Sequence, residues 1–231
     1  MGLFDKKYCS VCGGKIGLLD SCRKLENGNL CKSCADKLSP WFGKYRIPTV
    51  DQVKQQLDYR EANRARVAEF NATSAVGRDS TKLYIDDNAR RFTVHKGREL
   101  SADNPDILDF SQALGCELDI RESRTELRQT ISGRSESYNP PRYEYSYDFN
   151  VTIRVDSPYF SEMRFKLNGR AVQTGETQLD GINLGAWQIS RVDSSQHGKH
   201  GHSENNEFIM MGNALKETIE GWKNSEPTQA Q

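Results

Sequence analysis

The sequence lacks any long apolar run. No stretch approaches the roughly 20 apolar residues of a membrane-spanning helix, and residues 1–7 contain no apolar core of a secretion signal. Lys6 stands where a myristoylation signal carries Ser or Thr. The 231 residues are 35% hydrophobic and 28% charged, with a mean hydropathy of -0.77. We therefore expect a soluble, cytoplasmic protein without a transmembrane segment.

The sequence also lacks an excess of charge of either sign. The formal net charge is zero, and residues 1–47 carry nine Lys/Arg against four Asp/Glu, so this segment is +5 and the remainder -5. Four thiolates with one Zn²⁺ would add -2 and leave the segment at about +3. That charge is too small to predict nucleic-acid binding by itself.

Cysteine is scarce outside the N-terminal segment, where five of the six cysteines fall between positions 9 and 34. Without a secretion signal, metal ligation is a better expectation for them than disulfides. Cys9-Ser-Val-Cys12 and Cys31-Lys-Ser-Cys34 are two pairs separated by 18 residues, a spacing typical of structural zinc sites with four cysteines. A two-residue gap lets both sulfurs face one ion, and Gly13-Gly14 permits a tight turn after the first pair.

The residues between and after the two pairs predict a small finger over residues 1–40. Asn27-Gly28 lies between short strand-like pieces and predicts a hairpin, and residues 34–38 are compatible with a helix. Knuckle, hairpin and helix favour a treble-clef finger, with a zinc ribbon as the alternative. Four protein ligands leave no open position, so we expect one structural Zn²⁺ per chain. Disulfide or redox use and iron binding are the alternatives. The predicted ligands are Cys9, Cys12, Cys31 and Cys34.

The remaining candidate residues give no catalytic constellation. Cys22 has no Cys-x2-Cys partner and predicts a free, partly exposed thiol, although replacement of one ligand is an alternative. The three histidines of the segment 197–202, His197, His200 and His202, lie among Gly and Ser without nearby carboxylates, which disfavours a second metal site. His95 lies at a predicted strand end with no assignable nucleophile, and glycine-rich phosphate loops are absent.

Residues 41–75 predict a connector and one helix. Pro40 and Pro48 bound the connector, in which Trp41, Phe42 and Tyr45 are expected to anchor the finger. Residues 49–52 (TVDQ) form a capping-box signature, and helix-forming residues continue to about residue 70. The apolar stripe of this helix is broken by polar residues, so we expect it to span two bodies. It also carries three arginines, Arg60, Arg64 and Arg66.

Residues 76–225 predict an antiparallel β domain closed by a C-terminal helix, which makes the chain α+β. A hairpin is expected over residues 83–94, strands over 116–120, 163–167 and 187–189, and Cys116 in the core. A helix is expected to begin near residue 205 or 206, and residues 226–231 to form a disordered tail. The strongest alternation places seven apolar or aromatic residues at every second position: Tyr143, Tyr145, Tyr147, Phe149, Val151, Ile153 and Val155. This element order fits a pleckstrin-homology-like barrel, and an open antiparallel sheet crossed by a helix gives nearly the same pattern.

Several segments carry a resemblance to a known family. GLFDKKYCSVCGGKIGLL, RKLENGNLCKSCADKLSP and TVDQVKQQLDYREAN resemble the start of an uncharacterised family of bacterial and prophage-type proteins. Later segments such as YNPPRYEYSYDFNVTI and SPYFSEMRFKLN are similar to the remainder of its longer members. The family is described as carrying an N-terminal zinc ribbon of unknown function, which implies ligands at the four cysteines. Cys22 and the histidine segment depart from its pattern.

The sequence thus favours a non-enzymatic, zinc-binding adaptor that recognises a protein partner or a lipid-like surface. A nucleic-acid binder that uses the basic finger and the arginines of the helix is the first alternative. An enzyme of unknown class, with His95 in a cleft of the sheet, is the second. The partner and the oligomeric state are not predictable from these residues.

Overall fold

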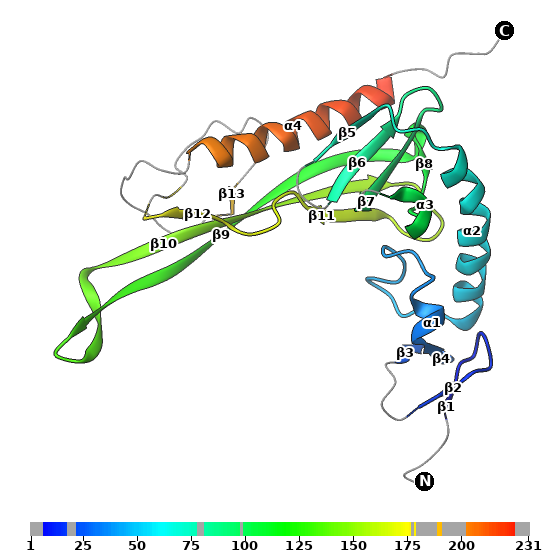
Figure 1. Cartoon of the computed structure of the whole chain (residues 1–231), viewed down its shortest axis with the longest axis horizontal. Coiled ribbons are helices and arrows are strands. Elements are labelled where there is room, and N and C mark those ends of the chain that lie inside the picture. The colour runs from blue at the N-terminus through cyan, green and yellow to red at the C-terminus, as the bar shows by residue number, and fades with distance from the viewer. Residues whose placement is uncertain are drawn as a thin grey trace.

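The computed structural model describes residues 7–17, 22–77, 81–97, 99–176, 178, 189–190 and 202–224. The described chain forms a small N-terminal finger, a helix beside it, and a larger body of two sheets and a second helix (Figure 1). The predicted C-terminal tail, His197 and His200 lie outside the described residues, as does the side chain of His202. No described helix is long and apolar enough to cross a membrane.

The finger consists of two short hairpins and one helical turn. Strands β1 (Lys7–Tyr8) and β2 (Lys15–Ile16) pair with each other, as do β3 (Cys22–Leu25) and β4 (Gly28–Cys31). Helix α1 (Lys32–Ala35) follows directly. The predicted hairpin is confirmed, but Leu25 pairs with Gly28, so the two-residue loop is Glu26-Asn27 and Gly28 begins the second strand.

Helix α2 (Val50–Glu69) begins at the predicted capping box. The Thr49 hydroxyl accepts a hydrogen bond from the backbone of Gln52, whose side chain accepts one from the backbone of Thr49. Its first half packs against the finger through Val53, which is fully buried, and its second half meets the sheets. The prediction that this helix spans two bodies is therefore confirmed.

The larger body contains two sheets. Strands β5 (Ser74–Val76), β6 (Thr81–Asp86), β7 (Arg91–Lys96) and β8 (Leu108–Asp109) form an antiparallel sheet in that order, with α3 (Leu100–Asp103) between β7 and β8 in sequence. After the 3-10 turn η1 (Phe110–Gln112), the second sheet has the order β11-β10-β9-β13, and β12 also pairs with β10. Its strands are β9 (Ala113–Ile131), β10 (Arg134–Val155), β11 (Glu162–Lys166), β12 (Val172–Gly175) and β13 (Ile189–Ser190).

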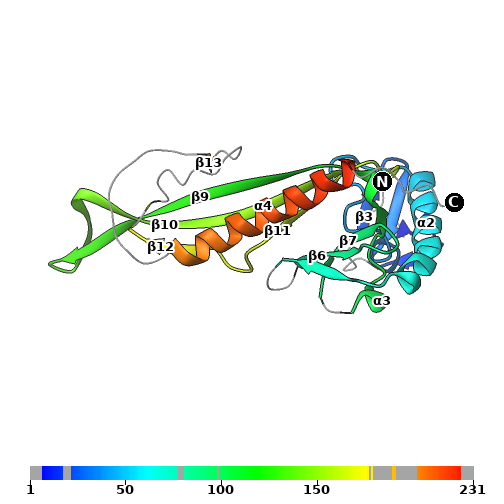
Figure 2. The same cartoon turned by 90° about the horizontal axis from the view of Figure 1, so that it is seen from above.

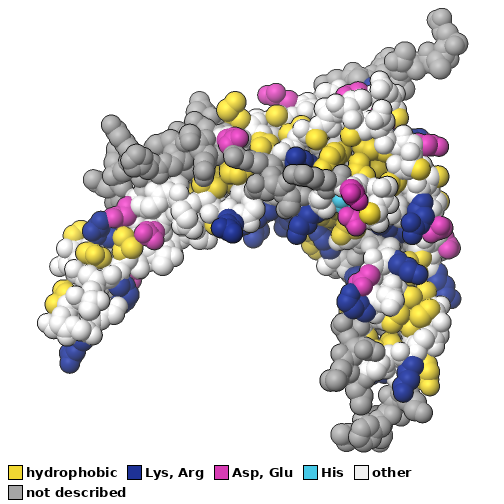
Figure 3. Space-filling view, viewed as in Figure 1, with side chains coloured by type: hydrophobic (Ala, Val, Ile, Leu, Met, Phe, Trp, Pro, Cys, Tyr) yellow, Lys and Arg dark blue, Asp and Glu magenta, His cyan; other side chains and the backbone are white. Residues whose placement is uncertain are grey.

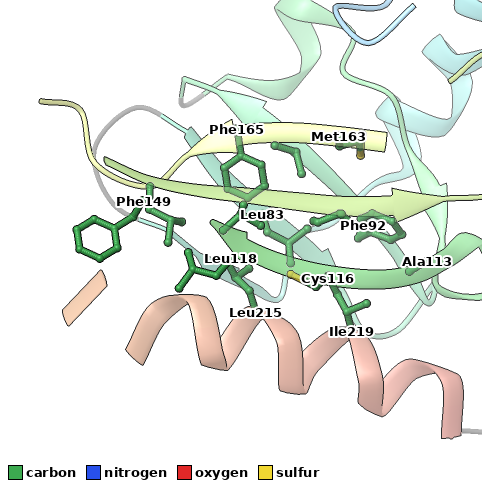
Figure 4. Close-up of a cluster of buried hydrophobic side chains, with 14 of the residues drawn as sticks. Leu83, Phe92, Ala113, Cys116, Leu118, Phe149, Met163, Phe165, Leu215 and Ile219 are labelled. Atoms are coloured by element: carbon green, nitrogen blue, oxygen red, sulfur yellow. The ribbon is translucent and has the colours of Figure 1, made fainter. Parts of the chain in front are cut away.

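The main core lies between these sheets and helix α4 (His202–Asn224). Every second residue of β10 from Tyr145 to Val155 is buried, which confirms six of the seven positions of the predicted alternation, and Tyr143 is half-buried. Leu215 and Ile219 of α4 point toward Leu118 and Cys116 of β9 (Figure 4). The amphipathic helix is thus confirmed, beginning at His202 rather than 205 or 206.

The predicted pleckstrin-homology-like barrel is not found among the described residues. Both sheets are open, and their pairings are antiparallel except for the two-residue contact of β13 with β9. The physical reason lies in strands β9 and β10, which are 19 and 22 residues long. They pair with each other far beyond the core instead of curling back to close a barrel. The open sheet crossed by a helix, the alternative to the barrel, describes the structure.

The ends of β9 and β10 form a projecting arm, which we call the ribbon (residues 122–144). Figures 1 and 2 show it extending away from the sheets and from α4. All its residues are exposed or half-buried, and the register shifts between Ser137 and Arg142, where four residues of β10 have no partner on β9. The sequence predicted only strand segments 116–120 and 143–155, because strands exposed on both faces show no apolar alternation.

A buried ion pair fixes α2 to the larger body. The Arg60 guanidinium lies 3.2 Å from the Asp106 carboxylate, and these side chains are 9% and 0% exposed. Arg60 also donates to the carbonyl of Lys37 (3.2 Å), while the Ser39 hydroxyl donates to Asp106 (2.7 Å). Ser39 and Lys37 immediately precede the connector. One pair of charges therefore holds the helix, the connector and the sheets together.

Removing one partner of this pair should lower the free energy of unfolding by more than removing both partners does. Arg60→Met leaves a buried carboxylate and Asp106→Leu leaves a buried guanidinium, so each should lower the free energy of unfolding by about 3–5 kcal/mol. The double variant buries no unpaired charge and should lose less than either single variant. Urea denaturation followed by tryptophan fluorescence measures all three.

Arg64→Met is the matched control, because Arg64 pairs only with Glu61 on the helix surface, where both side chains are more than half exposed. It should change stability by at most about 0.5 kcal/mol. A double variant whose loss equals the sum of the two single losses would contradict this account of the junction.

Candidate metal centre

The first cysteine pair lies on a knuckle between β1 and β2. The Cys9 backbone donates to the carbonyl of Gly14 (2.8 Å), and the Gly13 backbone donates to the carbonyl of Cys9 (2.9 Å). Gly13 has a φ of +73°, a left-handed conformation that favours glycine, so the predicted tight turn is confirmed. A Cβ on Gly14 would lie 3.3 Å from the sulfur of Cys12, so glycine also leaves room for that sulfur.

The second pair lies where β4 passes into α1. Cys31 is the N-cap of this one-turn helix and Cys34 lies within it, as expected for thiolates placed at a helix start. Backbone hydrogen bonding joins this part to the knuckle, since Ser10 donates to the carbonyl of Asn29 (2.8 Å). The Ser10 hydroxyl in turn accepts from the backbone of Asn29 (3.1 Å). The two pairs are thereby held against each other.

The structure brings together all four cysteines predicted as ligands. The sulfurs of Cys9, Cys12, Cys31 and Cys34 all lie within 4.8 Å of one another, and none is in a disulfide. Four sulfurs bound tetrahedrally at about 2.3 Å from one ion lie about 3.8 Å apart. The sulfurs of Cys12 and Cys31 are 3.8 Å apart. The arrangement therefore has the size of a four-thiolate metal site, and it could hold a metal ion.

The electrostatics of the cluster disfavour four ionised thiols without a cation. Burial alone would raise the pKa of the Cys9 thiol, but three backbone N–H groups that donate to its sulfur lower it to about 6. Burial raises the pKa of Cys34 to about 12, and hydrogen bonds that its thiol donates to Cys31, Cys12 and Cys9 and the negative charge of Cys9 act in the same direction. An ionised Cys9 thus opposes ionisation of its neighbour. A positive ion among the sulfurs would favour the thiolate form of each cysteine.

The finger has a small apolar core, which α2 and the connector complete. Leu25 and Leu30 are almost fully buried, and Phe42 and Val53 pack against them from outside residues 1–40. Trp41, the neighbour of Phe42, belongs to the core of the larger body instead. The predicted anchoring role of both side chains is confirmed, whereas Tyr45 is 70% exposed and donates only to Glu162.

Two polar residues that position the finger carry no recognisable signal in the sequence. The Asn27 side chain accepts a hydrogen bond from the backbone of Val50 (2.9 Å), so the hairpin loop caps the start of α2. Arg23 donates to the carbonyl of Gly43 in the connector (2.7 Å). The Asn-Gly signal located the loop, but nothing in the sequence shows that its side chain reaches residue 50.

The structure places the other candidate residues apart from the cysteine cluster. Cys22 is exposed and Cys116 is buried, which confirms both predictions. His95 is 8% exposed, with Nε2 3.3 Å from a carboxylate oxygen of Asp103. Burial lowers the pKa of His95 although the charge of Asp103 acts in the opposite direction.

His95 lines a cavity of about 530 Å³ between β7, β11 and the connector. Trp41 and Phe165 line this cavity too, together with the cationic side chains of Arg164 and Lys166. Its described lining contains no Ser or Cys. A cleft with convergent polar groups therefore exists at His95, but the described lining offers neither of the two commonest nucleophiles to this histidine.

Comparison with known proteins bears on the finger. Residues 7–56 match a family model described as "Domain of unknown function (DUF4428)". The matched segment ends within α2, just beyond Val53, so it includes the part of the helix that completes the finger core. No curated protein and no solved structure matches the chain. The resemblance of the later segments, and a bacterial or prophage origin, stay predictions.

Substitution of a single cysteine tests which sulfurs bind metal. Cys12→Ser removes one of four thiolates and should weaken zinc binding by more than the roughly 10–100-fold that loss of an outer partner costs. Competition with a chromogenic zinc chelator measures this affinity. Cys116→Ala is the matched control and should bind zinc as the native protein does, because Cys116 lies in the main core. Equal affinities for both variants would contradict the assignment.

Gly28 should be required for the contact between the hairpin and α2. A Cβ at this position would lie 2.4 Å from the Ser10 hydroxyl oxygen and 2.9 Å from a methyl group of Val50. Gly28→Ala should therefore lower the stability of the finger by about 1–3 kcal/mol. Amide hydrogen exchange over residues 22–31 measures the effect. Gly221→Ala, which has no neighbouring atom within 4 Å, should leave that exchange unchanged.

Proposed function

We propose that this protein is a zinc-stabilised, non-enzymatic adaptor whose ribbon recognises a protein partner. The ribbon carries the proposal, since its two strands pair mainly with each other. It contacts the rest of the described chain at its base, where Glu122 accepts a hydrogen bond from Gln178 and Arg142 pairs with Glu176. The finger has a structural role in this account. Its element order of knuckle, hairpin and helical turn supports a treble-clef finger over a zinc ribbon.

Zinc is the metal that the site favours. Four cysteine sulfurs in tetrahedral spacing are typical of structural zinc sites, and they leave no position open for water or a substrate. Iron bound by four cysteines has similar dimensions, so the choice rests on how common such zinc sites are in short fingers. A closed site argues against metal-centred catalysis.

The backbone of the ribbon supports strand pairing with a partner. Among the described residues, β13 pairs with β9 only at Ile120 and Arg121, and beyond them β9 pairs with β10 alone. Such an outer edge presents unpaired N–H and C=O groups, which an extended segment of another chain can complete. Pro140 and Pro141 interrupt β10, whereas residues 122–131 of β9 contain no proline. The edge of β9 is therefore the favoured surface.

The side chains of the ribbon favour a protein partner over a nucleic acid. The ribbon contains four arginines and four glutamates, so its net charge is zero. Figure 3 shows side chains of both charges intermixed at this end of the molecule. Two arginines already stack on rings, Arg124 on Tyr143 and Arg142 on Tyr138. A surface of this kind lacks the positive field that phosphate binding needs.

The arginines of α2 do not support the nucleic-acid alternative either. Arg60 is buried against Asp106, and Arg66 donates to Asp109 at 2.8 Å. Only Arg64 is largely exposed. The helix therefore cannot present the three arginines to phosphates as a group.

A shortened ribbon tests the proposal. In this variant, residues 127–142 are replaced by Asn-Gly, so that a two-residue turn connects Glu126 to its cross-strand partner Tyr143. Affinity capture from the native cell should return a protein with the full-length chain and not with the variant. Hydrogen exchange should then show that the captured protein protects the amides of residues 122–131.

Two results would contradict the adaptor function. One is capture of the same proteins by both chains while their thermal unfolding midpoints agree, because the ribbon would then be dispensable. The other is turnover on a panel of generic substrates that His95→Ala abolishes, because the cavity at His95 would then be an active site.

A further inference from the structure

Cys22 lies directly across the hairpin from Cys31, one of the four clustered cysteines. The register of β3 and β4 pairs Cys22 with Cys31 and Leu25 with Gly28. Residues opposite each other in an antiparallel pair point to the same face, so these two cysteines share a face of the hairpin. Leu25 and Leu30 occupy the other face and are buried in the finger core.

The position in the ladder suits a disulfide. Hydrogen-bonded and non-hydrogen-bonded pairs alternate from the closing pair Leu25–Gly28, which makes Cys22–Cys31 a non-hydrogen-bonded pair. The Cα atoms of such a pair lie about 4.5 Å apart with the side chains close together. Disulfides join Cα atoms about 4.4–6.8 Å apart. A bond between these residues therefore needs little movement of the backbone.

Cys22 is an exposed cysteine that lies outside the cluster of four. Cys12 in the cluster is exposed as well, Cys31 is half-buried, and Cys9 and Cys34 are buried. A metal ion would bind the sulfur of Cys12 but not that of Cys22, so Cys22 is the exposed thiol that stays free to react with an oxidant. The sulfur of Cys31 belongs to the cluster, where it lies 3.8 Å from the sulfur of Cys12. Bonding of Cys31 to Cys22 would withdraw one of the four sulfurs from the ion.

We propose that Cys22 and Cys31 form an oxidisable pair, and that the disulfide between them releases the metal from the finger. The proposal rests on the zinc site proposed above and goes beyond the adaptor function. It assigns Cys22, which zinc binding does not use, to sensing of hydrogen peroxide. Since α2 completes the finger core, loss of the metal would also loosen the packing of the start of this helix.

The chemistry balances with hydrogen peroxide as the oxidant. The Cys22 thiolate attacks one peroxide oxygen and the O–O bond breaks. Hydroxide is the leaving group, and Cys22 becomes a sulfenic acid. The Cys31 sulfur then attacks the Cys22 sulfur, and the S–O bond breaks as the S–S bond forms. The two sulfurs lose two electrons and the peroxide gains them. With the proton released from the Cys22 thiol, the oxygen products are one water and one hydroxide.

The test treats reduced, zinc-loaded full-length protein with hydrogen peroxide and follows zinc release with a chromogenic chelator. Peptide mass spectrometry of the product should find Cys22 joined to Cys31, and dithiothreitol with zinc should restore the loaded protein. Cys22→Ser should release zinc at least about tenfold more slowly than the native chain. Cys116→Ala, which removes the other cysteine outside the cluster, should release zinc at the native rate.

The outcomes distinguish a failure of this inference from a failure of the proposed zinc site. Reduced protein that binds no zinc contradicts the zinc site itself. Zinc-loaded protein in which peroxide joins Cys12 to Cys31, or leaves Cys22 reduced, overturns the assignment of the pair alone. Equal zinc release from the native chain and Cys22→Ser overturns it as well.

Discussion

The coordination of four sulfurs around one position is the constraint on which the N-terminal part of this protein depends. The finger buries few apolar side chains. Of the eight buried residues in its core cluster, two are the clustered Cys9 and Cys34, and two more, Phe42 and Val53, come from the connector and α2. Such a segment supplies little core of its own, so a metal ion bound by the four sulfurs would contribute much of its folding free energy. The turn at Gly13 and the start of α1 at Cys31 both place sulfur atoms around this position.

A second set of contacts transmits the geometry of the finger to the rest of the chain. Asn27 in the hairpin loop caps α2, and the Arg60–Asp106 pair holds the same helix to the sheets. The adjacent residues Trp41 and Phe42 enter different cores, so the connector is anchored on both sides. The finger and the larger body are thus joined by one helix and one connector, each of which contacts both. The ribbon projects from the other end of this assembly (Figure 1).

The sequence predicted those features that repeat with a regular period or spacing. The cysteine spacing located the cluster, the capping box located the start of α2, and the alternation from Tyr145 to Val155 located the central strand. It did not predict the ribbon, whose strands are exposed on both faces. It also did not predict the Arg60–Asp106 pair, because residues 46 positions apart carry no local signal of contact. The barrel was expected because the order of elements is the same in open and closed sheets.

X-ray absorption at the zinc edge of the purified, reduced protein tests the central claim most directly. The account predicts one zinc per chain, with four sulfur neighbours at about 2.3 Å and no nitrogen or oxygen neighbour. A shell that contains nitrogen or oxygen, or fewer than four sulfurs, would contradict a closed site made by Cys9, Cys12, Cys31 and Cys34. Protein that folds natively without any bound metal would contradict the dependence of the finger on coordination.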